Sequence, residues 1–255
     1  MSDAERLLAC FEAGTLLRPS ADTPNSVDLA RALARLAGAA GAPGGGAAAS
    51  IAEEIGESRH LVFVLVDGMG AGILGRLSSD SFLRRHIVRD LQAVFPSTTS
   101  TALTSLATGE WASSHAVTGW WTYLEEIGGP ATVLPWVTRF GGEPLGDRGV
   151  TLGDVFPLPS LVSSFNRSSA AVLPQQIQRS DCSRYFTGGT VRRGYTNVPH
   201  AVDRVLERVA SAPGASYTYM YLPQVDAAAH SSGTEDPSVT SALMEVDREL
   251  ERLSG

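Results

Sequence analysis

The chain has 255 residues, of which 43% are hydrophobic and 18% charged, so it can bury a core as one large domain or two small ones, and general disorder is excluded. Its formal net charge is -7, and all 20 of its basic side chains are arginines, which excludes catalysis by a lysine. Because these arginines are scattered, we expect neither a nucleic acid duplex nor a membrane surface as a partner.

Cysteine usage and the first residues bear on the compartment. Cys10 and Cys182 are far apart in the sequence, which fits neither a disulfide framework nor a thiolate zinc site. The segment from Met1 to Glu12 carries acidic residues instead of a basic region before an apolar run, so no secretory signal is visible and a cytoplasmic location is predicted. No apolar stretch approaches the length of a membrane span.

The first 58 residues predict a helical segment followed by a connector. Apolar residues at helical spacing indicate a helix over Ser26–Leu36. The Gly/Ala-rich stretch 38–49 after it is typical of a flexible connector. We therefore separate residues 1–58 from a core that spans residues 59–255.

A parallel sheet is predicted from the elements that open this core. The continuous apolar run His60–Val66 is typical of a strand buried on both faces, and a helix over 70–77 and a second strand over 91–95 follow it. Two strands joined by a helix indicate a parallel βαβ unit. After Pro96, a helical apolar face begins behind four hydroxyl residues and ends at Gly109.

The second half of the chain is less regular at first. Residues from about 120 to 199 are rich in glycine, proline, serine and aromatic residues, which predicts loops that form an insertion or lid. Beyond them we expect a helix over 201–209, a strand over 217–222 and an amphipathic helix over 237–253. Strands that alternate with helices in this way predict the α/β fold class.

Asp67 and Thr99 occupy positions that favour phosphate chemistry. Asp67 ends the apolar strand, where open α/β sheets bind ligands, and its carboxylate could hold a cation; an ordinary Asp-Gly turn is the alternative. Thr99 stands at a helix start, where free amide groups favour a phosphate; a role as helix cap is the alternative. A nucleophilic threonine must lose its proton, and in the absence of lysine a metal ion is the natural activator.

Asp226 and His230 form a second candidate pair. Their spacing of four residues would let one helical turn aim both at a single point, as in a two-ligand metal clamp, although a capping aspartate beside a solvated histidine has the same spacing. A third pattern, G-x-G-x-x-G over 70–75, follows a strand as in dinucleotide-binding folds. This pattern leaves a dinucleotide-dependent oxidoreductase as an alternative function. The alternative is the weaker one, because Asp67 and two further residues separate the strand from the first glycine.

The blocks 61–68, 95–109 and 221–230, in this order and spacing, resemble the nucleotide pyrophosphatase/phosphodiesterase branch of the alkaline phosphatase superfamily. The resemblance implies an α/β fold with a mostly parallel central sheet flanked by helices and a loop-rich insertion. It also implies hydrolysis of phosphoric esters or anhydrides of small molecules, with two divalent metal ions as cofactors. Zinc is the usual ion, with manganese and magnesium as alternatives.

The same resemblance assigns roles to the candidate residues. Asp67 would bind one ion, and Thr99 would be the metal-bound nucleophile that attacks phosphorus. Asp226 and His230 would bind the other ion. The cations and the helix N-terminus would stabilise charge on the phosphoryl oxygens, and a phosphothreonine intermediate with net retention at phosphorus would follow.

The chain departs from the family pattern in two ways. Trp120 and Trp121 stand where the family carries an asparagine that binds a phosphoryl oxygen; they could line a substrate pocket or pack in the core or lid. The family's later Asp-His-Gly motif and a still later histidine are not in the chain, so we expect a core that is incomplete at its C-terminal side. The alternative function is therefore a non-catalytic phosphate- or nucleotide-binding protein.

Overall fold

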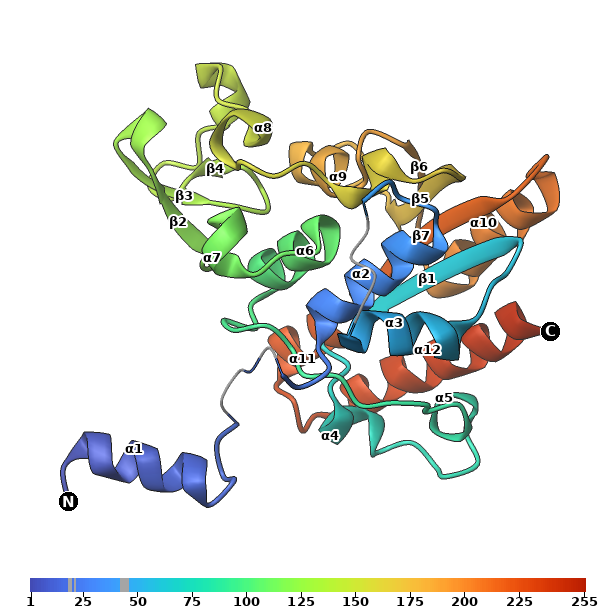
Figure 1. The fold of residues 1–255 in the computed structure, drawn as a ribbon, viewed down its shortest axis with the longest axis horizontal. Coiled ribbons are helices and arrows are strands. Elements are labelled where there is room, and N and C mark those ends of the chain that lie inside the picture. Colours follow the sequence, from blue (N-terminus) through green and yellow to red (C-terminus); the bar gives the residue numbers. More distant parts are fainter. Residues whose placement is uncertain (18–19, 21, 42–45) are drawn as a thin grey trace.

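The computed structural model describes residues 1–17, 20, 22–41 and 46–255. Its centre is a parallel four-stranded sheet in the order β1–β7–β5–β6, which confirms the predicted α/β fold class (Figure 1). The strands of this sheet are β1 (His60–Val66), β5 (Ser168–Pro174), β6 (Val191–Tyr195) and β7 (Ser216–Leu222).

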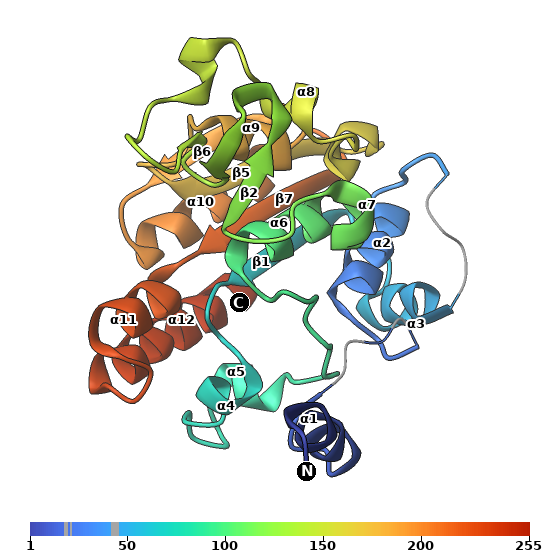
Figure 2. The same ribbon diagram turned by 90° about the vertical axis from the view of Figure 1, so that its left-hand side faces the viewer.

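Helices cover both faces of the sheet, and Figure 2 shows α11 and α12 on one side and α2 and α3 on the other. The helices are α1 (Asp3–Glu12), α2 (Ser26–Leu36), α3 (Gly46–Ile55), α4 (Ala71–Leu74), α5 (Phe82–Arg85), α6 (Thr99–Thr108), α7 (Ala112–His115), α8 (Leu152–Val155), α9 (Asp181–Phe186), α10 (Val198–Ser211), α11 (Gln224–Ser232) and α12 (Pro237–Ser254). None of the described helices is long and apolar enough to cross a bilayer.

The alternation of side chains along β7 decides which helices pack on which face. Met220 and Leu222 point into the cluster that includes residues of α10 and α12. Tyr217 packs with Leu33 of α2, and Tyr221 belongs to a cluster that also holds residues of α6. Burial of both faces explains why apolar and aromatic residues predominate in this strand.

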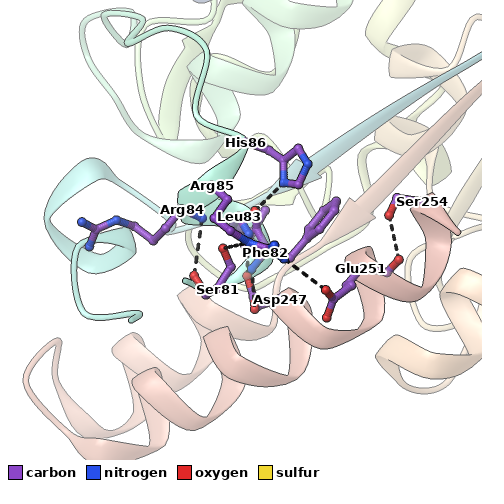
Figure 3. A network of polar contacts seen from close by, with 9 residues as sticks. All are labelled: Ser81, Phe82, Leu83, Arg84, Arg85, His86, Asp247, Glu251 and Ser254. Atoms are coloured by element: carbon purple, nitrogen blue, oxygen red, sulfur yellow. Dashed lines mark hydrogen bonds and ion pairs between the residues drawn. The ribbon is translucent and has the colours of Figure 1, made fainter. Parts of the chain in front are cut away.

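A polar contact fastens α5 to α12 (Figure 3). The carboxylate of Asp247 accepts hydrogen bonds from the backbone N–H groups of Phe82, at 3.3 Å, and Leu83, at 2.7 Å. Arg85 pairs with Glu251 one turn further along α12, at 3.3 Å. A helix of one turn is marginal alone, so these contacts from α12 hold the segment that follows the first strand.

A small antiparallel sheet precedes β5. It consists of β2 (Trp121–Leu124), β3 (Gly129–Thr132) and β4 (Val137–Thr138). Its core is built around Trp136, which is buried with Leu145 and Phe156 and donates a hydrogen bond to the Val150 carbonyl at 2.8 Å. The prediction of loops over 120–199 is therefore correct only in part, because this sheet, β5 and β6 all lie within that range.

The strand predicted over 91–95 is wrong. These residues form only an isolated bridge, between Gln92 and Asn25. Leu91 is apolar because it packs against the cluster of α2 and α3 that contains Ala32 and Ile51, and Val94 is buried as well. The predicted βαβ unit does not form; the partner of β1 is β7, much later in the chain.

Two other expectations change in the N-terminal part. The connector predicted over 38–49 is helical from Gly46, since α3 begins there and buries Ala48, while residues 42–45 lie outside the described residues. The helix predicted over 70–77 is the single turn α4. The division between residues 1–58 and 59–255 stays a prediction.

β1 is less buried than its apolar sequence predicts. Within the part of the chain that the structure describes, β1 pairs with β7 alone and forms the edge of the sheet. Except for Leu61, its residues are only half-buried. A cavity of about 920 Å³ runs along this edge and is lined by Phe63, Val64 and Leu65 together with apolar residues of the segment 83–93.

Candidate functional site

Asp67 lies at the carboxyl end of β1. Its N–H donates a hydrogen bond to the Leu222 carbonyl at 2.9 Å, which extends the pairing of β1 and β7 by one step. Gly68 adopts a φ of +74°, and a Cβ there would lie 2.7 Å from Cα of Asp226. Only glycine fits this close approach, which brings the Asp-Gly dipeptide against the start of α11.

Thr99 is the first residue of α6. Thr98 is the N-cap residue, but its side chain makes no capping hydrogen bond, and Ser100 donates its hydroxyl to the Gly119 carbonyl at 2.8 Å. The Thr99 hydroxyl points to Asp67 and donates to its Oδ2 at 3.5 Å. The alternative of a capping role for Thr99 is thus not what the geometry favours.

Tyr221 is part of the site, although the sequence did not single it out. Its hydroxyl donates a hydrogen bond to Oδ2 of Asp67 at 2.6 Å. Burial, and then the negative charge of Asp67, raise the pKa of Tyr221 well above its usual value, so the phenol stays a donor. The signal in the sequence is the run of alternating tyrosines in β7, but the contact depends on the pairing of β7 with β1.

Asp226 and His230 lie one turn apart on α11. Oδ1 of Asp226 is 3.5 Å from Nε2 of His230, whose side chain is 80% exposed. Burial, and then the negative charge of Asp67, raise the pKa of Asp226, and His230 opposes this shift. Burial and a nearby carboxylate both disfavour the charged form of an aspartate, which is why the pKa of Asp226 rises.

The donor types at this site suit a divalent cation. Asp67 and Thr99 present oxygen atoms, and Asp226 and His230 present a carboxylate and an imidazole, which are ligands of zinc, manganese and magnesium. Each pair supplies two side chains, and the described residues contain no group of three or more acidic, histidine or cysteine side chains that could hold a metal. The donor types therefore suit divalent cations, and each pair among the described residues supplies fewer ligands than a closed tetrahedral site.

A buried histidine, His115, connects α6 to the neighbouring helix α7. His115 is fully buried; its Nδ1 accepts a hydrogen bond from the Val117 N–H at 3.1 Å, so the proton resides on Nε2 and is donated to Oγ of Ser105 at 2.9 Å. Burial lowers the pKa of His115 to about 4. This neutral pair connects α6 to α7 and keeps the helix that carries Thr99 in place.

The glycine pattern over 70–75 does not open a long helix. It lies on α4, which is one turn long, whereas a dinucleotide-binding motif opens the full helix of a βαβ unit. Both cysteines are free, as expected, and burial raises the pKa of the Cys182 thiol. The single turn of α4 does not support the oxidoreductase alternative.

In this parallel α/β sheet an acidic residue at a strand end lies beside a threonine at a helix start. Residues 61–254 match the family of type I phosphodiesterases and nucleotide pyrophosphatases, and the chain belongs to this family. The family resemblance predicted from the sequence is confirmed.

Solved structures agree on the fold. The chain is similar to murine ectonucleotide pyrophosphatase/phosphodiesterase 5, with a TM-score of 0.54 and 16% identity over 76% of this chain and 51% of that one. An inactive threonine-to-alanine variant of the same murine protein, in complex with AMP, gives a TM-score of 0.55 and 15% identity over 76% and 50%. The chain thus spans about half the length of these structures. No curated protein matches it.

Proposed function

We propose that the chain carries the phosphoryl-transfer site of a metal-dependent phosphoric ester hydrolase in which Thr99 is the nucleophile. The observation that carries the proposal is the Thr99 hydroxyl, which lies at the N-terminus of α6 and 3.5 Å from the Asp67 carboxylate. The family match supports the reaction class. The murine relative is described as inactive after a threonine-to-alanine change, which is consistent with a threonine nucleophile.

In the proposed reaction, the Thr99 oxygen attacks phosphorus and the bond to the leaving oxygen breaks, with the proton that the hydroxyl loses passing to the leaving oxygen. Water then hydrolyses the phosphothreonine, which releases the phosphoryl product and restores the Thr99 hydroxyl. Asp67 accepts the hydrogen bond of Thr99 and orients its oxygen, while Tyr221 holds Asp67. The first-turn amide groups of α6 and the helix dipole stabilise negative charge on the phosphoryl oxygens.

Two divalent cations would complete this site. Asp67 and Thr99 would hold one, and Asp226 and His230 the other. When bound, such ions supply charge neutralisation and lower the pKa of a coordinated hydroxyl. With two side chains each, we expect weak binding by this chain, because affinity rises with the number and geometry of the ligands.

The test compares wild type and Thr99→Ala on a diester and a monoester reporter, with zinc or manganese present. We expect turnover to fall by about a hundredfold or more, since the step that forms the covalent intermediate is lost. Thr98→Ala is the matched control, because this neighbouring hydroxyl makes no capping bond. Equal turnover by wild type and Thr99→Ala would refute the nucleophile assignment.

A non-catalytic phosphate- or nucleotide-binding role is the second candidate. The observation that favours it is the small number of metal ligands among the described residues. The murine relative is described in complex with AMP, so AMP is a suitable probe. Calorimetry that detects AMP binding by a folded wild-type chain without turnover would favour this candidate over hydrolysis.

A further inference from the structure

A second cavity, of about 630 Å³, lies between the central sheet and the small antiparallel sheet. Its floor is formed by the ends of β5 and β7, and its other walls come from α6, from α9 and from the segment 120–135. We call it the apolar cavity and define it by six of its lining residues: Leu103, Trp120, Leu173, Ile177, Phe186 and Tyr221. Its volume is typical of small-molecule sites.

The apolar cavity adjoins the proposed phosphoryl site. Tyr221 lines it, and the hydroxyl of the same residue donates to Asp67. Leu103 also lines it and follows Thr99 by four residues on α6, so the two side chains lie on the same face of the helix, one turn apart. A phosphoryl group placed at Thr99 therefore has this cavity beside one of its ester oxygens.

The described residues that line the cavity carry no charge. Arginine, aspartate, glutamate and histidine do not occur among them, and the polar members, such as Gln176, Ser180 and Thr187, are neutral. A second phosphate placed there would lose its water without meeting a cation, which is strongly unfavourable. Alkyl or aromatic surface would gain from the same environment.

We propose, on the basis of the proposed function, that the apolar cavity holds an uncharged and mainly apolar group of the substrate. This group is an alkyl or aryl substituent attached to the phosphoryl group that Thr99 attacks. The cavity would thereby select phosphoric esters of apolar alcohols or phenols over substrates that place a second phosphate at this position.

Direct binding tests this proposal without turnover. Methylphosphonate and hexylphosphonate carry the same charged group and differ in the length of the alkyl chain. The difference between their affinities, measured by calorimetry with zinc present, therefore reports the contribution of the cavity alone. We expect hexylphosphonate to bind wild type at least about tenfold more tightly, since each buried methylene can contribute up to about fourfold in affinity. Thr99→Ala should keep this ratio, because Leu103 and the other cavity walls are unchanged.

Two pairs of variants locate the effect. Ile177→Asp puts a charge at the cavity and should reduce the ratio to about twofold or less; Leu206→Asp is matched, because the two residues are 37% and 39% exposed and Leu206 lies outside the cavity. Trp120→Ala removes a cavity wall, whereas Trp121→Ala changes its neighbour, which stacks on Arg139 instead. Only Ile177→Asp and Trp120→Ala, the first member of each pair, should weaken the binding of hexylphosphonate.

The outcomes separate this proposal from the proposed function. Equal affinity for the two phosphonates would overturn the role of the cavity and leave the phosphoryl site at Thr99 intact. Failure of both phosphonates to bind a folded chain would overturn both proposals. AMP binding that is tighter than hexylphosphonate and is lost in Ile177→Asp would assign the cavity to a nucleoside and overturn the apolar assignment.

Discussion

The two halves of the site are held in different ways. Asp67, Thr99 and Tyr221 come from three elements and are joined by hydrogen bonds that centre on one carboxylate oxygen. Asp226 and His230 come from one helix, and the histidine side chain is largely exposed. The first half is therefore fixed by the fold itself, whereas the second half depends on local spacing and would gain order from a bound cation.

Disturbing the close contact between the two halves, at Gly68 and Asp226, should have the largest effect on stability. Gly68→Ala places a Cβ 2.7 Å from Cα of Asp226 and forces alanine into a positive φ, so we expect a loss of about 3 kcal/mol in the free energy of unfolding. Gly70→Ala is the matched control, because a Cβ there meets nothing within 4 Å and φ is −78°. Urea unfolding of both variants checks this, and equal midpoints would contradict the close approach of Asp226.

Acid should next weaken the support of α6, the helix that carries Thr99. The pKa of His115 is about 4 in the folded state against an ordinary value of 6.5, so the unfolded chain binds more protons between these pH values. Stability from this group is complete above pH 6.5 and falls as the pH drops towards 4, by up to about 3 kcal/mol.

Chemical unfolding at a series of pH values measures this slope. His115→Gln should flatten it between pH 6.5 and 4, even if the variant is less stable at neutral pH. His200→Gln, at a half-buried position on α10, is the control. An unchanged slope in His115→Gln would show that another group titrates in this window.

Removing the hydroxyl group of Tyr221 should reduce stability by a smaller amount. Tyr221→Phe deletes the hydrogen bond to Asp67, and we expect a loss of about 1.5 kcal/mol in stability and about tenfold in metal affinity, because the carboxylate loses its orienting donor. Tyr219→Phe is the control, since this tyrosine lines the same cavity and lies on the same strand. Thermal unfolding and metal titration read out the two effects, and identical metal affinities would exclude a positioning role for Tyr221.

A change in the second half should lower metal affinity with little loss of stability. His230→Ala should change stability by less than about 0.5 kcal/mol, because the side chain is 80% exposed, while metal affinity falls by about tenfold. Ser231→Ala on the same helix is the control. A large loss of stability in His230→Ala would mean that the two halves are held alike.

More of the second half than of the first could be predicted from the sequence. The spacing of Asp226 and His230 is a local property, so a helix is enough to bring them together. Tyr221 was missed because its contact with Asp67 requires β1 and β7 to be neighbours. The two strands are far apart in the chain, and the hydrogen bond from Tyr221 to Asp67 spans 154 positions. Long-range pairing of this kind leaves no periodic signal.

The same reasoning explains the errors in the fold. β6 contains two arginines and a glycine, and the apolar run of β5 is only four residues long and follows two serines, so the prediction of loops missed both strands. The segment 91–95 is mostly apolar, but its Leu91 packs against α2 and α3 instead of pairing as part of a strand. The roles of the site residues, the identity of the metal and the cytoplasmic location stay predictions.

The edge position of β1 has a consequence for backbone hydrogen exchange. In a parallel strand that is paired on one side, alternate N–H groups point to the neighbouring strand and the others point away from it. Within the described residues β1 has β7 alone as its partner, so every second amide of this strand can exchange without the sheet opening. Asp67 thus stands at the end of an edge strand whose backbone is paired on one side, and exchange along His60–Val66 reports directly on anything that binds beside it.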